Sequence, residues 1–167
     1  MSKVAAIMTN EVEDIEYQSP HEVLVAAGHT VDLVENEAHK AIVGKHGAEF
    51  MTDKSIDDIT VEEYDALFIP GGFSPDQLRA DVRYVNLVKD FLLADKPIFA
   101  ICHGPQIMIQ TGLTKGRILT GYVTIVPDLY YAGAIVKDEP VVVDRHLVTS
   151  RTPDDLKQFN QAILKQL

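Results

Sequence analysis

Uninterrupted hydrophobic runs recur along the chain, and short polar segments separate them. The clearest run is 97–102, where five of the first six residues after Lys96 are apolar and no polar position alternates with them. Such a run is typical of a parallel strand that is covered on both faces. The runs at 4–8 and 65–70 have a similar character, and 30–34, which contains Asp32, also has the composition of a strand. We therefore predict strands in these four places, with those at 65–70 and 97–102 buried.

Segments with helical spacing lie between these runs. One carries Val23 and Leu24 and closes at Gly28, and another ends near Ala94. A closing helix is predicted over Pro153–Leu167, and further strands at 141–143 and 147–149. The region 35–58 is irregular, with a possible hairpin near 48–51. This alternation predicts one α/β domain over residues 1–167, with a mainly parallel sheet and helices on both faces.

The strand at 97–102 ends on Cys102, the single cysteine of the chain, and continues into His103, Gly104 and Pro105. A strand-to-helix turn at Cys102 would expose the cysteine side chain, as the nucleophile elbow of an α/β-hydrolase exposes its nucleophile. The G-x-S-x-G signature of that elbow is absent here. The start of a helix favours negative charge, so we expect this thiol to ionise more easily than usual. The simpler interpretation is that Cys102 is a small buried hydrophobe.

Other polar groups follow the neighbouring strands and should meet Cys102 at the carboxyl edge of the sheet. Gly71 and Gly72 can form a tight turn and can also bring backbone N–H groups close to an oxyanion. An acidic cluster follows the first strand, and spacing alone does not choose among its members Glu11, Glu13, Asp14 and Glu16. His103 is a possible base, but side chains of adjacent residues generally diverge, so it would need an orienting partner.

Charge and composition narrow the classes of function. There are 25 acidic against 15 basic residues, a formal net charge of −10, and no basic run. Nucleic acid and anionic membranes are therefore not expected partners. No signal peptide or membrane-length run is present, and one cysteine cannot form an intrachain disulfide, which favours a cytoplasmic location. The six histidines lack metal-ligand spacing and no nucleotide loop occurs, so we expect no metal and no cofactor.

Several motifs together resemble those of the ThiJ/PfpI (DJ-one) superfamily, close to its PfpI-like intracellular protease/amidase and general-stress-protein branch. In chain order they are Asn10–Glu16, Gly44–Gly47, Ile69–Gly72, Ala100–Gln106, Ala132–Gly133 and Ser150–Arg151. The resemblance implies a flavodoxin-like sandwich, similar to the class I glutamine amidotransferases, with Cys102 as nucleophile on a strained elbow.

The resemblance also implies roles for individual residues. The glutamate that hydrogen-bonds the cysteine falls on Glu13, and the oxyanion-hole amides fall on Gly72 and His103. PfpI-like members place a glutamate after the diglycine that reaches the histidine across a subunit interface, and this chain has the shorter Asp76 there. A homodimer or higher homo-oligomer is therefore expected.

Two further departures from related patterns concern the surroundings of the thiol. Residues 121–124 read Gly-Tyr-Val-Thr where relatives often have Tyr-Pro-Gly, which would alter the pocket wall near Tyr122. His146 is followed by Leu147 and Val148, so the His-x-Glu of the amidotransferase triad is not completed.

Three functions agree with this pattern. The first is a stress-response glyoxalase or protein deglycase, in which the Cys102 thiolate attacks a small aldehyde or a glycated protein. The second is a cysteine peptidase or amidase that forms an acyl-enzyme. The third is a redox sensor or chaperone-like stress protein without catalysis, in which the thiol is oxidised.

Overall fold

The computed structural model describes all 167 residues and is built on one seven-stranded sheet. The strand order is β10-β11-β7-β6-β1-β2-β5, and only β10 runs antiparallel to its neighbour. The bounds of these strands are β1 Lys3–Ile7, β2 Thr30–Glu35, β5 Lys54–Ser55, β6 Ala66–Ile69, β7 Ile98–Ile101, β10 Val141–Asp144 and β11 Leu147–Ser150. Two small sheets flank it, formed by β3 Ala41–Val43 with β4 Glu49–Met51 and by β8 Ile118–Leu119 with β9 Ile135–Val136.

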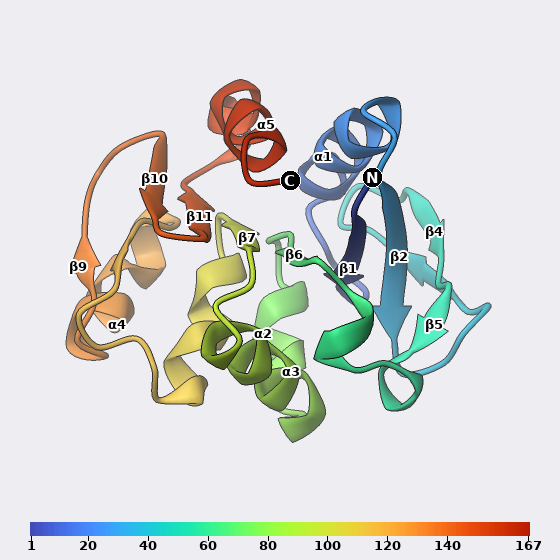
Figure 1. Cartoon of the computed structure of the whole chain (residues 1–167), viewed down its shortest axis with the longest axis horizontal. Helices are drawn as coiled ribbons and strands as arrows, with labels where there is room; N and C mark the ends of the chain where they lie inside the picture. The colour runs from blue at the N-terminus through green and yellow to red at the C-terminus, as the bar shows by residue number, and fades with distance from the viewer.

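Helices cover both faces of the sheet. Helices α1 and α5 lie side by side on one face, at the top of Figure 1, whereas α2 and α3 lie at the bottom beside the 3-10 helix η3. Their bounds are α1 Asp14–Ala26, α2 Ser74–Leu78, α3 Val82–Leu93, η3 Gly104–Thr111, α4 Val126–Tyr131 and α5 Leu156–Leu164. Single 3-10 turns occupy η1 Ile56–Asp58, η2 Val61–Glu63, η4 Val123–Ile125 and η5 Pro153–Asp155.

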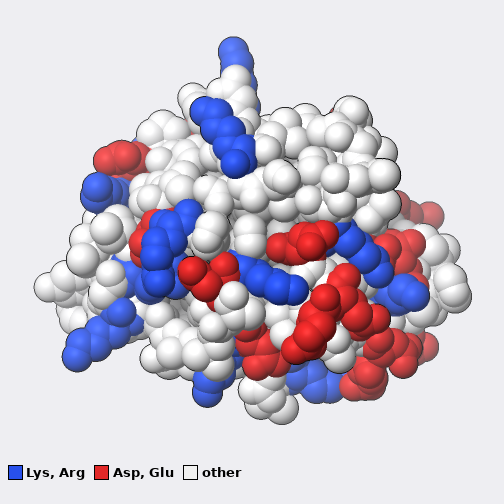
Figure 2. Space-filling model, in the orientation of Figure 1, with Lys and Arg blue, Asp and Glu red and all other residues white.

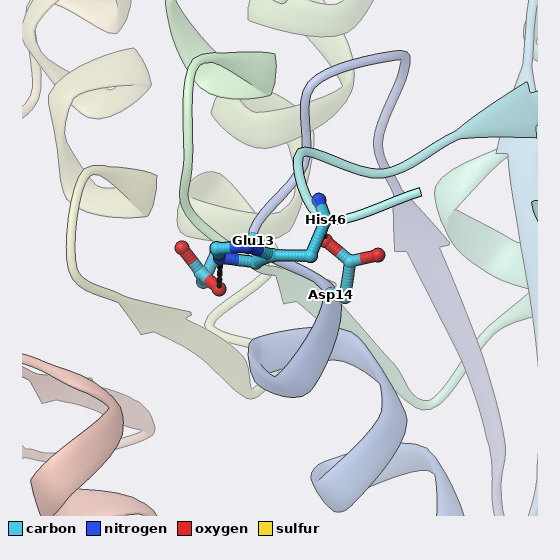
Figure 3. Close-up of side chains that lie close together, drawn as sticks. All are labelled: Glu13, Asp14 and His46. Carbon is cyan, nitrogen blue, oxygen red and sulfur yellow. Dashed lines mark hydrogen bonds and ion pairs between the residues drawn. The ribbon is translucent and has the colours of Figure 1, made fainter. Parts of the chain in front are cut away.

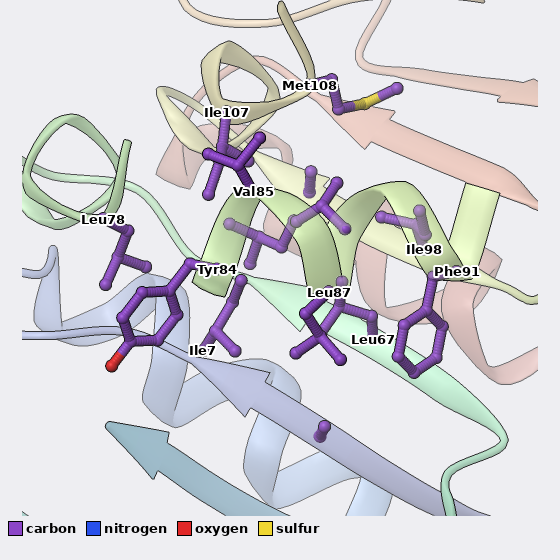
Figure 4. Packing of buried hydrophobic residues seen from close by; sticks show 14 of the residues in the cluster. Ile7, Leu67, Leu78, Tyr84, Val85, Leu87, Phe91, Ile98, Ile107 and Met108 are labelled. Atoms are coloured by element: carbon purple, nitrogen blue, oxygen red, sulfur yellow. The ribbon is translucent and has the colours of Figure 1, made fainter. Parts of the chain in front are cut away.

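Strand β7 shows why the central strands lack polar positions. Its residues Ile98 and Ala100 point into the core beneath α3 and η3, whereas Phe99 and Ile101 point into the core beneath α1 and α5. Both cores are therefore built from alternate residues of the same strands. Figure 4 shows the first core, in which Tyr84 and Phe91 of α3 pack on the sheet.

The structure confirms the predicted α/β architecture, and each predicted strand and helix has a counterpart in it. The hairpin near 48–51 is formed by β3 and β4. The helix predicted after Cys102 is present and is a 3-10 helix. The short elements β5, β8, β9 and α4 were not predicted from the pattern. None of the helices combines the length and the hydrophobicity that a membrane-spanning segment requires.

The chain changes direction within the sheet at β1. From β1 it passes to β2 on one side, and later returns to β6 on the other side. Ligands of open α/β sheets bind outside the carboxyl ends of the strands at such a point. The loops that leave β1, β6 and β7, three consecutive strands of the sheet, carry the predicted site residues.

Candidate active site

Cys102 forms a sharp elbow immediately after β7. Its φ is +61°, in the left-handed region that side chains other than glycine rarely adopt. Two distant segments hold this conformation: the Cys102 N–H donates to the Ser150 carbonyl (3.0 Å), and its carbonyl accepts from the Tyr122 N–H (2.8 Å). Strained backbone of this kind persists only where the surrounding structure imposes it. The thiol is buried, with 7% of the residue exposed, although the sequence predicts a displayed side chain.

Two backbone N–H groups point to the thiol, those of Gly72 and His103. Gly72 lies in the loop after β6 with φ +74° and bridges to Val12. A Cβ at this position would collide with the backbone of the β1–α1 loop, lying 2.8 Å from the Val12 carbonyl carbon. Glycine is therefore required both by the conformation and by the close approach of two loops. The two predicted oxyanion-hole amides thus converge on one atom.

The carboxylate beside the thiol belongs to Glu16, and the expected contact of Glu13 with the thiol is wrong. Glu16 lies in the first turn of α1, is completely buried, and contacts the Cys102 thiol through its side chain. One of its oxygens, Oε2, accepts the N–H of Gly71 at 2.9 Å. The other, Oε1, is buried and accepts no N–H or O–H from the chain.

Glu13 is turned toward the loop between β3 and β4. Its Oε1 lies 2.9 Å from Nε2 of His46 and its Oε2 lies 3.4 Å from Nζ of Lys45, as Figure 3 shows for His46. Glu13 is the residue that precedes α1, whereas Glu16 lies nearly one turn further on and faces the sheet. This difference of position explains why one glutamate reaches the thiol and the other does not.

Burial dominates the electrostatics of the pair. It raises the pKa of the Glu16 carboxyl to about 7 against the opposing effects of the Cys102 and Gly71 hydrogen bonds. Burial and the negative charge of Glu16 also raise the pKa of the Cys102 thiol, which the N–H groups of His103 and Gly72 lower in part. The expectation of an easily ionised thiol is therefore wrong for a thiol that faces an ionised Glu16.

The His103 imidazole lies against the thiol. Its Nδ1 is 3.4 Å from the Cys102 sulfur and its Nε2 is 3.3 Å from Oγ1 of Thr124, while its ring lies over Tyr122 with centroids 4.8 Å apart. The adjacent side chains do not diverge, because the left-handed elbow turns both toward the pocket. Burial and the positive charge of Lys45 lower the pKa of His103, and the Asp76 carboxylate partly opposes them.

A pocket of about 670 Å³ opens over this cluster. It brings together all the predicted site residues, namely Glu13, Gly72, Asp76, Cys102 and His103. Asp76 reaches the pocket from α2 of the same chain, without a second subunit. The arrangement can therefore hold a carbonyl compound between a sulfur nucleophile, two N–H donors and a buried carboxyl group.

The DJ-1/PfpI family model matches residues 2–166. This chain belongs to the DJ-1/PfpI family. It is 51% identical over 165 residues to the Bacillus subtilis protein named "Putative cysteine protease YraA", with 99% of this chain and 98% of that protein covered. It is 53% identical to the Staphylococcus aureus protein SAV1875 over 167 residues, which cover 99% of this chain and 98% of the relative.

Solved structures of DJ-1/PfpI proteins have the same fold. Schizosaccharomyces pombe DJ-1 superposes with a TM-score of 0.89 at 25% identity, covering 99% of this chain and 91% of that one. A two-domain protein from Anabaena variabilis with DJ-1/ThiJ/PfpI-like and ferritin-like domains gives a TM-score of 0.96 at 37% identity. This chain is covered to 99% by that match and spans about half of the two-domain protein (48%).

One group in this DJ-1/PfpI chain has the composition of a metal site. Ligand atoms of Glu13, Asp14 and His46 lie within 4.8 Å of one another (Figure 3). Both oxygens of Asp14 already accept backbone N–H groups, from His46 (2.8 Å) and Ala48 (2.9 Å). These bonds fasten the β3–β4 loop to the start of α1, so the cluster has a structural explanation without a metal.

The sequence pattern left Glu16 open as one of four acidic residues, and the family resemblance selected Glu13 instead. Neither the pattern nor the resemblance indicated Thr124 as the partner of His103. A signal for Glu16 is present, because Glu16, Pro20 and Leu24 follow one another at intervals of four residues and all three are buried in α1. An acidic residue on the buried stripe of a helix requires a polar partner. Thr124 carries no such signal, since its position depends on how the segment after β8 folds over His103.

Proposed function

We propose that this protein is a cysteine-dependent enzyme of the glyoxalase or deglycase type, which acts on reactive carbonyls through Cys102. The observation that supports this most directly is the convergence of two N–H donors and a buried carboxyl group of raised pKa on a single thiol. A reducing compartment such as the cytoplasm would keep this single thiol available. A role in the response to carbonyl stress belongs to the same proposal.

Attack by sulfur forms a bond to the aldehyde carbon of a 2-oxoaldehyde and places negative charge on the carbonyl oxygen. The N–H groups of Gly72 and His103 are positioned to donate to that oxygen next to the sulfur. Glu16 accepts the thiol proton during attack, because a carboxyl group with a pKa near 7 is half ionised at neutral pH. The product of this step is a hemithioacetal.

The hemithioacetal is then converted by proton transfer. A base removes the proton from the former aldehyde carbon, a proton is delivered to the neighbouring carbon, and a thioester results. Water hydrolyses the thioester to a 2-hydroxy acid and restores the thiol. The net reaction adds one water molecule to the 2-oxoaldehyde and requires no external oxidant or reductant. Glu16, which forms a side-chain hydrogen bond with Cys102, can take and return these protons.

A peptidase or amidase is the second candidate, and His103 favours it. The Nδ1 atom of this residue lies 3.4 Å from the sulfur, and Thr124 contacts its other nitrogen. A neutral imidazole, which the lowered pKa favours, can take the thiol proton and pass it to a leaving amine. The name of the Bacillus subtilis relative is consistent with this candidate.

Asp76 bears on the choice between these candidates. It lines the pocket of its own chain and acts on His103 through its charge. We propose that in a homo-oligomer a second Asp76 also approaches His103, as the resemblance to PfpI-like proteins implies. Sedimentation of the protein, compared with the activity of an Asp76→Asn variant, tests this step. A monomer that retains peptidase activity would contradict it.

Three assays on the same protein separate the functions. The wild type, Cys102→Ala and Glu16→Gln are incubated with methylglyoxal, with a fluorogenic peptide and with hydrogen peroxide. We expect D- or L-lactate from methylglyoxal in the wild type only, with rates at least about 100-fold lower in both variants, since loss of an acid–base group costs 10²–10⁴-fold. Glu13→Gln is the matched control and should keep most of the activity.

Lactate formation by Cys102→Ala would overturn the catalytic assignment. Cysteine-dependent peptide hydrolysis without lactate would favour the peptidase. Oxidation of Cys102 to a sulfinate without turnover of either substrate would favour a sensor function.

A further inference from the structure

A short turn beside the elbow holds the imidazole of His103 from two sides. The turn is η4, Val123–Ile125, and Tyr122 precedes it. The Tyr122 ring lies over the imidazole, with the two ring centroids 4.8 Å apart. At the edge of the imidazole, Oγ1 of Thr124 lies 3.3 Å from Nε2, which is the only hydrogen-bond partner of this hydroxyl within the chain. One segment therefore contacts both a face and an edge of the ring.

The position of the imidazole proton decides what His103 offers to the sulfur. Burial and the positive charge of Lys45 lower the pKa of His103, which Asp76 partly opposes, so the ring is neutral at pH 7. A neutral imidazole has one nitrogen that donates and one that accepts. With the proton on Nδ1, which lies 3.4 Å from the sulfur, the ring donates to the sulfur. With the proton on Nε2, it can instead accept the thiol proton at Nδ1.

The other neighbour of the sulfur indicates which of these forms is present. Burial has the largest effect on both Cys102 and Glu16, but the side-chain hydrogen bond between them acts to lower the pKa of Glu16 and to raise that of Cys102. These are the directions expected for a thiol that donates to a carboxylate. A thiol has only one proton to donate, so its sulfur faces His103 with lone pairs. Nδ1 then makes a hydrogen bond only if it carries the proton.

We propose that Thr124 is a positioning residue, whose hydroxyl donates to Nε2 of His103 and thereby holds the proton on Nδ1. The hydrogen bond made by one ring nitrogen selects the protonation of the other. The donors then run in one direction, from Thr124 to His103, from His103 to the sulfur, and from the thiol to Glu16. Thr124 is exposed, so water can satisfy the lone pairs of its oxygen while its O–H faces the ring.

This inference rests on the proposed function and narrows the roles within the same site. His103 donates to the sulfur and stabilises the thiolate, while Glu16 takes the thiol proton. A thiolate beside a protonated carboxyl group is suited to addition to an aldehyde. The peptidase candidate requires the opposite tautomer, because its imidazole takes the thiol proton at Nδ1. The Thr124 hydroxyl therefore favours the first candidate over the second.

Nitrogen NMR of the protein with isotope-labelled histidine observes the tautomer directly, because protonated and unprotonated ring nitrogens have well-separated chemical shifts. The chain has six histidines, and the spectrum of His103→Gln identifies the signals of His103 by their loss. We expect the Nδ1–H tautomer in the wild type at pH 7. Thr124→Val, which keeps the shape of threonine without its hydroxyl, should lose this preference. Thr124→Ser should restore it.

Thr152→Val is the matched control for loss of a threonine hydroxyl. Thr152 lines the cavity on the other side of Tyr122, and its side chain makes no capping hydrogen bond to the turn that follows it. Its backbone is extended, with φ −152°, a conformation that valine adopts readily. The His103 tautomer should therefore be the same in this variant as in the wild type.

Thiol reactivity gives a second readout without turnover. In alkylation by iodoacetamide the sulfur bonds to the methylene carbon and iodide leaves. The reagent is uncharged, which matters because the net charge is −10 and acidic side chains gather at the lower right of Figure 2. We expect Thr124→Val to be alkylated about three- to tenfold more slowly than the wild type at pH 7, as loss of one hydrogen bond predicts. Thr124→Ser should recover most of the rate.

The Nε2–H tautomer in the wild type would overturn the proposal, and so would an unchanged Nδ1–H preference in Thr124→Val. Slower alkylation that Thr124→Ser does not recover, or that Thr152→Val shares, would also contradict it. The expected tautomers without lactate formation from methylglyoxal would support the role of Thr124 and overturn the proposed enzymatic function, so the two failures are distinguishable.

Discussion

Glu16 and Cys102 form a buried pair whose charge states depend on each other. An ionised Glu16 disfavours the thiolate, and burial disfavours the ionised form of either group. A glutamine at position 16 would still accept the Gly71 N–H, since its amide oxygen can replace Oε2. It would also carry no charge. This substitution therefore isolates the effect of charge with little change in shape.

The pH profile of thiol alkylation should respond to this pair. In Glu16→Gln we expect the midpoint for iodoacetamide alkylation of Cys102 to fall by at least about one pH unit, because the negative charge that opposes ionisation is removed. Glu13→Gln should leave the midpoint within a few tenths of a unit, since Glu13 is paired with His46 and Lys45. Equal shifts in the two variants would contradict the assignment of Glu16.

Stability should also depend on Glu16. Burial raises its pKa from 4.5 to about 7, so between these values the folded state binds a proton that the unfolded state has lost. The contribution of Glu16 to the unfolding free energy therefore decreases as pH rises through this interval and does not change at higher pH. The contribution is about 3 kcal/mol at most. In urea titrations from pH 4.5 to 8, the unfolding free energy of Glu16→Gln relative to that of the wild type should increase up to pH 7. A difference between the two proteins that does not change with pH would contradict this.

The sequence identified the residues whose roles follow from local conformation. Cys102 ends a buried strand and Gly72 lies in a diglycine turn, and both patterns are visible over a few residues. The choice between Glu13 and Glu16 depends on where α1 begins and which of its faces meets the sheet. Motif position favoured the wrong glutamate because helix boundaries are poorly specified by local sequence.

At the scale of elements, the site depends on how closely the loops after β1, β6 and β7 approach one another. Gly71 lies between Glu16 and the elbow, where a Cβ would collide with Oε2 of Glu16 and lie 2.8 Å from Cβ of Cys102. The glycine is therefore a spacer between the carboxyl group and the thiol-bearing residue. Its hydrogen bond to Glu16 also sets the orientation of that carboxyl group.

Gly71→Ala should disrupt the site more than a glycine substitution elsewhere. We expect a loss of about 1–3 kcal/mol of stability, typical of overpacking, together with loss of most thiol-dependent activity. Gly47→Ala is the control, because a Cβ at Gly47 meets nothing within 4 Å and only the positive φ (+91°) opposes it. Thermal unfolding and the lactate assay on both variants provide the measurement. Full activity in Gly71→Ala would contradict the spacer role.

Strands and long helices were predictable because hydrophobic runs define them, as in β6 and β7. The elements β8 and β9 contain two residues each, too few for a periodic pattern. The helix predicted after Cys102, from Gly-Pro followed by apolar residues, is present as a 3-10 helix that packs against α2 and α3. The sequence pattern did not specify which type of helix it would be.

At the scale of the molecule, α5 closes the second core. Phe159 and Ile163 are fully buried against the sheet beside α1, and Asn160 donates to Oγ of Ser19 at 2.8 Å. This contact joins residues 141 positions apart. Helix α5 therefore stabilises the side of the sheet that is covered by α1, the helix that carries Glu16.

Phe159→Ala should cost about 3–5 kcal/mol of unfolding free energy, as large-to-small substitutions of buried aromatic residues do. Leu164→Ala, on the partly exposed side of the same helix, should cost less than about 1 kcal/mol. Equilibrium denaturation in urea gives both values. If the two costs are equal, α5 does not bury the face seen in the structure.

The two hydrogen bonds that hold Cys102 in its elbow also set when the site can form. One donor is the N–H of Tyr122 and one acceptor is the carbonyl of Ser150, so both partners are synthesised after the cysteine itself. Chains grow from the amino terminus, so Cys102 is added to the chain 48 residues before Ser150, whose carbonyl accepts its N–H. A nascent chain therefore carries Cys102 without these two hydrogen bonds, and the strained elbow forms only when β11 joins the sheet.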